Sequence, residues 1–187
     1  LLVPAAVCLL AGLDAALILL GLPAPVTTAR LPDVHGVVLV LGLVGTLVAL
    51  ERAVALGHRA GHAAPLLLGT GAVLLLTPVP VDVGRTLLVL GTAGLVIVYV
   101  PLWRRRRDDA VLVQALAAVL ATGAAVLVLG GMPVADVVPW LAGFVVLTIG
   151  GERLELARLA MGPRAGTVLV VLCSAVAVAV VASLLWP

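Results

Sequence analysis

The sequence has no lysine and no asparagine, and all eleven of its basic residues are arginine. Charged residues make up 11% and aromatic residues 3% of the 187 positions, whereas hydrophobic residues reach 64%. So little charge excludes a water-soluble globular protein and indicates a multi-pass membrane protein. The arginine-only basic set, with abundant Ala, Val, Leu, Gly and Pro, is the codon bias expected of a GC-rich bacterium.

Cysteine and serine are also scarce. Cys8 and Cys173 lie within apolar segments, where a thiol behaves as a small hydrophobe, so no disulfide framework is indicated. Ser174 and Ser183 have no histidine or lysine nearby in sequence to activate them, which argues against a serine hydrolase. No other catalytic set is evident. The chain begins at Leu1 rather than with methionine, and we expect further residues ahead of it.

Long uncharged runs divide the chain into membrane spans. A helix rises about 1.5 Å per residue and the hydrocarbon layer is about 30 Å thick, so a crossing needs roughly 20 residues. We predict an all-α polytopic membrane protein, a single domain of seven transmembrane helices. The spans are expected at about 2–22, 34–54, 63–81, 85–103, 110–131, 136–158 and 165–186.

Two of these spans have charge-free windows that are too short. Residues 36–50 and 137–151 are fifteen residues each, or about 22 Å of helix. Their polar flanks must therefore enter the membrane or its interface. Ionisable residues in a membrane are candidates for function, which directs attention to these two helices.

Arginine counting predicts the orientation. Nine arginines fall on one side of the predicted membrane and two, Arg30 and Arg85, on the other. The positive-inside rule places the nine-arginine side in the cytoplasm of a bacterial inner membrane, with the N-terminus inside and the C-terminus outside. The net charge of +2 thus reflects topology, and the expected partner is the lipid bilayer, not nucleic acid.

An offset of 101 residues relates the two short spans. It aligns Gly42 with Gly143 and Glu51-Arg52 with Glu152-Arg153. We predict a duplication in which spans 1–3 and 5–7 are parallel repeats and span 4 is a connector. Such repeats are common in transporters, with the substrate site at their interface. Chance likeness between two arginine-capped apolar helices is the alternative.

The repeated Glu-Arg pairs belong to a predicted polar cluster on the cytoplasmic side. If spans 2 and 6 are neighbours, the cluster would bind an anion, relay protons or pin two helices together. Asp14 differs because it lies mid-span without a sequence neighbour of opposite charge, so it needs a hydrogen-bond partner such as Thr46 or a proton. The candidate site residues are Asp14, Glu51, Arg52, Glu152, Arg153, Glu155 and Arg158.

His35 opens the second span on the external side, within residues 32–42, PDVHGVVLVLG. This stretch resembles the His-Gly start of the second helix in heme-copper oxidase subunits and in the NnrS membrane family, which implies that His35 is an axial heme ligand. Those folds have more spans and further histidines on later helices, which this chain lacks. His35 would hold a five-coordinate heme, or one position of a metal site completed by Asp14 or a partner subunit. The alternative is an interfacial histidine that caps its helix.

Three functions remain open from the sequence. The first is a small-solute or ion carrier or channel-like bundle. The second is an accessory subunit of a larger membrane complex, with a homo-oligomer also open. The third is a heme- or metal-binding redox or sensor protein that uses His35.

Overall fold

The computed structural model describes residues 2–26, 28, 30–157 and 164–184, and gives the backbone alone at 106, 157, 164 and 165. Every regular element in this part of the chain is a helix, as predicted. In order these are α1 (Leu2–Leu19), α2 (Leu31–Val37), the π-helix η1 (Val38–Gly45), α3 (Thr46–Leu56), the 3-10 turn η2 (Arg59–His62), α4 (Ala63–Leu75), α5 (Val81–Arg106), α6 (Asp109–Leu129), α7 (Val134–Ala157) and α8 (Arg164–Ala182).

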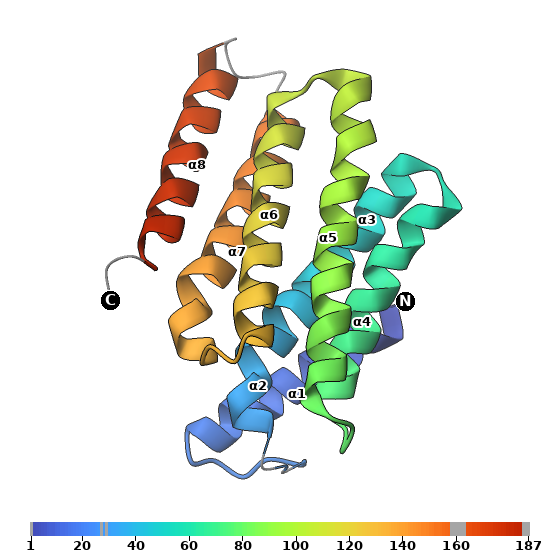
Figure 1. Cartoon of the computed structure of the whole chain (residues 1–187), viewed down its shortest axis with the longest axis vertical. Helices are drawn as coiled ribbons and strands as arrows, with labels where there is room; N and C mark the ends of the chain where they lie inside the picture. The colour runs from blue at the N-terminus through green and yellow to red at the C-terminus, as the bar shows by residue number, and fades with distance from the viewer. Residues whose placement is uncertain (1, 27, 29, 158–163, 185–187) are drawn as a thin grey trace.

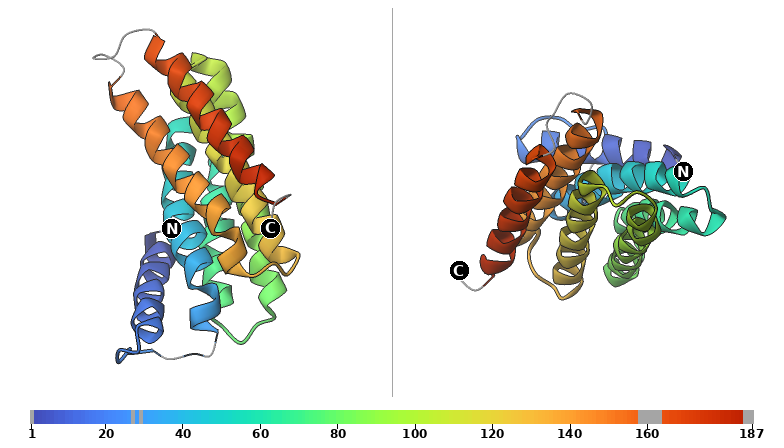
Figure 2. Two further views of the ribbon diagram at one scale, coloured as in Figure 1. Left: turned by 90° about the vertical axis from the view of Figure 1, so that its left-hand side faces the viewer. Right: turned by 90° about the horizontal axis from the view of Figure 1, so that it is seen from above.

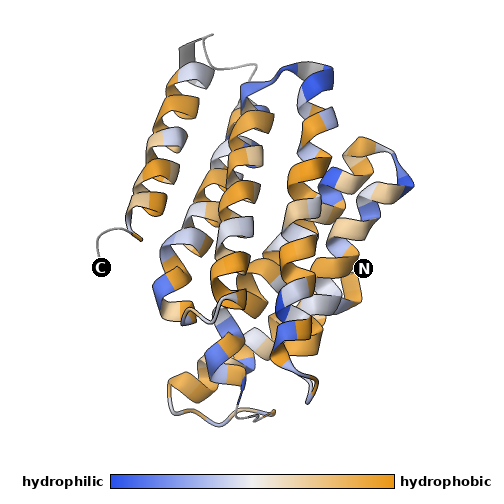
Figure 3. Ribbon diagram, in the orientation of Figure 1, coloured by the Kyte–Doolittle hydropathy of each residue, from blue (hydrophilic) through white to orange (hydrophobic). Residues whose placement is uncertain are grey.

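The long helices lie side by side (Figure 1). Helix α6 lies between α5 and α8, α7 packs against α6, and α4 packs against α5 and η1. Helix α1 lies beside α2 and η1, toward the end of the bundle opposite the α5–α6 connection (Figure 2). Apolar residues cover most of the helix lengths and hydrophilic residues gather toward the two ends (Figure 3). This distribution is the one expected of helices that cross a membrane.

Five helical segments in the described chain are long and apolar enough to cross a membrane: Leu2–Leu19, Leu31–Leu56, Val81–Arg105, Asp109–Leu129 and Val134–Leu156. Seven spans of that kind are therefore not supported. The expected span at 63–81 is a thirteen-residue helix, α4, which covers about 20 Å. It ends early because Pro78 and Pro80 follow, and proline disfavours a helical conformation in the residue before it. In α8 the apolar part is Gly166–Ala182.

The second predicted span is one continuous helical segment formed by α2, η1 and α3. Both polar flanks of its charge-free window lie inside this helix, as the short window required. The segment is not a regular α-helix throughout. The π-helix η1 has i→i+5 hydrogen bonds, which rotate α3 about the helix axis relative to α2. Helix α3 then ends at Gly57, whose left-handed φ of +70° closes the C-terminus.

Small residues of this segment form a surface that packs against neighbouring helices. Gly42, Thr46, Ala49 and Ala53 are all buried. A methyl group added at Gly42 would lie 2.8 Å from Sγ of Cys8, so the glycine permits close approach to α1. It faces α1 and α4 and not Gly143, which packs against Leu120 of α6. Gly42 and Gly143, which the 101-residue offset aligns, therefore do not contact each other.

Candidate functional site

Arg52 is the centre of a polar cluster at the end of α3. Its side chain is only 7% exposed, although it is charged. Nη2 contacts the carboxylates of Glu51 and Glu152, the second at 3.3 Å. Nη1 donates to Oε1 of Gln114 at 3.2 Å and lies 3.5 Å from Oε2 of Glu155. A buried guanidinium needs such partners because an unpaired charge away from water is very costly.

The cluster joins three helices. Glu51 and Arg52 come from α3, Gln114 from α6, and Glu152 and Glu155 from α7. Gln114 also donates from Nε2 to Oε1 of Glu152 at 3.3 Å, so it bridges the guanidinium and one carboxylate. The structure therefore brings Glu51, Arg52, Glu152 and Glu155 together at the ends of α3 and α7.

Sequence reasoning missed two residues that build this cluster. Gln114 is the single glutamine of the chain and lies inside an apolar run, which is the signal that would have identified it. Tyr99 of α5 is buried and lies within electrostatic reach of Arg52. Tyrosine occurs only once in the chain, also within an apolar span.

A cavity of about 310 Å³ opens beside the guanidinium, and we call it the vestibule. Its lining is formed by Glu51, Arg52, Ala55, Leu102, Arg105, Val111 and Glu155. Nε of Arg52 is buried and has no hydrogen-bond partner in the described part of the chain. The exposed Arg105 donates from Nη1 to the carbonyl of Leu56 at 3.1 Å, which ties the end of α5 to the end of α3. The vestibule therefore combines two carboxylates, Glu51 and Glu155, with two guanidinium side chains, Arg52 and Arg105.

The charge of the cluster is unbalanced. Three carboxylates surround Arg52, and Arg105 adds a second guanidinium to the vestibule lining, which leaves one negative charge in excess when all five groups are ionised. Side-chain exposure is 54% for Glu51, 35% for Glu152 and 36% for Glu155, and of these three Glu51 and Glu155 line the vestibule. Among the described residues, no group of three His, Cys, Asp or Glu side chains is arranged to hold a metal ion. A cavity of this size with carboxylates in its lining has room for a small polar organic molecule.

The remaining cluster candidates lie elsewhere. Arg153 is exposed on α7 and has no hydrogen bond or ion pair with any described residue, so it is not part of the cluster. Arg158 lies outside the described residues. Asp14 is half-buried and lines a separate cavity of about 250 Å³, with Thr28 and apolar side chains. The suggested hydrogen bond from Thr46 is not formed, since Oγ1 of Thr46 is buried without a partner in the described chain.

His35 is half-buried on α2, at the end of the bundle opposite the vestibule. Its Nδ1 lies 2.7 Å from the carbonyl oxygen of Pro32. A carbonyl only accepts, so Nδ1 carries the proton and Nε2 is the nitrogen left to bind a ligand. The lining of the Asp14 cavity does not include His35. The two residues are therefore not brought to one cavity.

Comparison with known proteins gives a family for the whole chain. The family described as Domain of unknown function (DUF8744) matches residues 1–187. The chain belongs to this family. No curated protein and no solved structure matches it significantly. The family description gives no function, so the function of this DUF8744 member has to be inferred from the geometry of its own residues.

Proposed function

We propose that the chain is an integral protein of the bacterial inner membrane and a carrier for a small solute that bears an amine. The observation that carries this proposal is the vestibule, where the carboxylates of Glu51 and Glu155 line a cavity large enough for a small organic molecule. The carboxylates would take the amine.

The arginine run 104–107 forms the end of α5, at the same end of the bundle as the vestibule. Under the positive-inside rule this end faces the cytoplasm, so the vestibule would open to the cytoplasm. The proposed orientation has the N-terminus inside and the C-terminus outside. Beyond the vestibule the core is closed by fully buried side chains: Leu41, Phe144 and Leu147. A carrier would need a second arrangement of helices to open the other side.

The proposed duplication offers a basis for that second arrangement. The first set consists of α1, the α2–η1–α3 segment and α4; the second set consists of α6, α7 and α8. Each set contains three helices that all touch one another. Parallel repeats of this kind move as units in known carriers, around a site at their interface. Arg52 and Glu152 come from different sets, so relative motion of the sets would change the vestibule.

Reconstitution into liposomes tests the carrier proposal. Radiolabelled putrescine, a small diamine, is the probe, and uncharged butanediol is the matched control. Uptake of putrescine above empty liposomes, competed by unlabelled putrescine but not by butanediol, supports the proposal. The Glu155→Gln variant should lower uptake, and Asp33→Asn, which removes an exposed carboxylate at the other end of the bundle, should not. Equal uptake by empty liposomes would overturn it.

A second candidate function follows from the hydrogen bond of His35. A histidine whose Nδ1–H is held by a backbone carbonyl presents Nε2 in the orientation used by ligating histidines. The candidate is a heme- or metal-binding protein with His35 as ligand. An absorption spectrum and metal analysis of the purified protein test it. A Soret band or bound metal that is lost in His35→Ala supports it, and a colourless, metal-free wild type removes it.

A further inference from the structure

An apolar groove runs along α6 between α5 and α8. It consists of two cavities, one of about 490 Å³ near the arginine run and one of about 1050 Å³ farther along. Both are lined by Val96, Leu116, Val119 and Ser174, so they are continuous. The α6 residues that line it extend from Leu112 to Val126, about 21 Å by the helical rise. This length exceeds half of the roughly 30 Å hydrocarbon layer.

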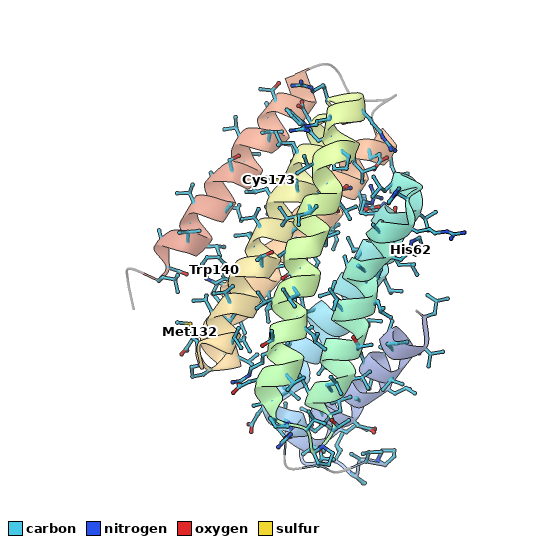
Figure 4. The ribbon with its side chains drawn as sticks, turned by 45° about the vertical axis from the view of Figure 1, so that its right-hand side comes forward. His62, Met132, Trp140 and Cys173 are labelled. Carbon is cyan, nitrogen blue, oxygen red and sulfur yellow. The ribbon has the colours of Figure 1, made fainter. Side chains whose placement is uncertain are left out.

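Small side chains keep the groove open. Ala93 of α5 and Ser174 and Ala177 of α8 face it. On its floor the ring of Trp140 occupies the space beside Gly123, where an added methyl group would collide with the ring. In Figure 4, Trp140 and Cys173 lie on this α6–α8 side, away from His62 at the start of α4. The groove thus lies on a different side of α6 from the α3 side of the vestibule.

The end of the groove near the arginine run is cationic. Arg104 lines it, is exposed, and has no hydrogen bond or ion pair with a described residue. The guanidinium of Arg107 lies 4.5 Å from the centroid of the Trp103 ring, and that ring also lines the groove. Four consecutive arginines against Asp108 and Asp109 leave this segment with net positive charge. An apolar channel with a cationic mouth matches an acyl chain below an anionic headgroup.

We propose that this groove is a binding site for an anionic phospholipid of the cytoplasmic leaflet. Its phosphate would lie against Arg104 and Arg107, and an acyl chain would extend along α6 past Ser174. Basic residues next to a membrane span attract anionic lipid by roughly 1 kcal/mol each, or about fivefold in affinity. An apolar helix of a partner protein in the same groove would not supply a negative charge to pair with Arg104. The inference assumes membrane insertion but does not depend on the vestibule.

Native mass spectrometry of the full chain, purified with equimolar phosphatidylglycerol and phosphatidylcholine, tests the site. The wild type should retain one phosphatidylglycerol in preference to phosphatidylcholine. Arg104→Gln should reduce the retained fraction about fivefold. Ser174→Phe places a large ring at a position that lines both cavities, so it should lower retention of both lipids.

Two matched variants control for folding and for general charge. Arg153→Gln removes an exposed arginine outside the groove, and Ala175→Phe adds the same ring one residue along α8, where it does not line the groove. Both should retain phosphatidylglycerol like the wild type. Equal retention of the two lipids, or equal loss in the matched controls, would overturn the site. A lipid-free dimer that Ser174→Phe dissociates would assign the groove to a second copy instead.

Discussion

Gly151 and Gln114 are in close contact across the interface between α7 and α6. A methyl group added at Gly151 would lie 2.5 Å from Cγ of Gln114 and 3.0 Å from the carbonyl oxygen of Ala110. This glycine lets α7 come near enough for Glu152 to accept the hydrogen bond from Gln114. The polar cluster thus depends on a packing position as well as on its charged residues.

Replacing Gly151 by valine should destabilise the protein, because the α6 backbone at Ala110 cannot move aside as a flexible side chain would. We expect a cost of about 1–3 kcal/mol from overpacking, seen as a lower thermal midpoint in detergent. Gly150→Val is the matched control, since nothing lies within 4 Å of a methyl group there. Equal effects of the two variants would contradict the close packing of α7 on α6.

Arg52→Gln removes the guanidinium from three carboxylates. Loss of one partner from a buried ion pair costs about 3–5 kcal/mol, and we expect the lower part of that range because the carboxylates are partly exposed. Thermal unfolding followed by circular dichroism measures the change. Arg153→Gln should stay within about 0.5 kcal/mol of the wild type. A neutral effect of Arg52→Gln would show that the cluster does not hold the helices together.

Gln114→Leu should weaken the link between α6 and the other two helices. The change removes the acceptor for Arg52 and the donor for Glu152, while leucine retains much of the buried apolar packing. We expect about 1–3 kcal/mol of destabilisation from the lost partners. In the Arg52→Gln background the same change should cost less, because one partner is already gone. Additive effects in this double-mutant cycle would contradict a shared network.

Cysteine labelling tests the proposed orientation. In a Cys8→Ala, Cys173→Ala background, Val79→Cys between α4 and α5 should react with a membrane-impermeant maleimide added to intact cells. Arg59→Cys, before α4, should react only after the cells are permeabilised. This outcome would also establish that the thirteen-residue α4 crosses from one side to the other. Labelling of Arg59→Cys in intact cells would contradict the positive-inside assignment.

The sequence predicted the helical class, and most of the long helices, from charge-free runs alone. It overestimated the third predicted span, at 63–81, because hydropathy extends through Thr77 and Val79, whereas the prolines at 78 and 80 follow the end of the helix at Leu75. It gave no sign that the second span departs from a regular α-helix. The π-helix at 38–45 contains Gly42, which packs closely against α1 and α4, and the hydropathy pattern does not indicate it.

Part of the site was also predictable. The repeated Glu-Arg pairs identified Glu51, Arg52 and Glu152, because charge is costly near lipid and therefore conspicuous. The pairs are not equivalent in the structure: Arg52 is buried at the centre, whereas Arg153 is exposed. Which arginine turns inward depends on the neighbouring helices.

Binding of putrescine to the purified protein tests the central claim most directly. Isothermal titration calorimetry in detergent should give a saturable heat with one site for the wild type and none with butanediol. Glu51→Gln and Glu155→Gln should each weaken binding by about fivefold, the value expected for a partly exposed charge pair, and Asp33→Asn should leave it unchanged. No heat with the wild type, or equal weakening by Asp33→Asn, would contradict the vestibule as an amine-binding site.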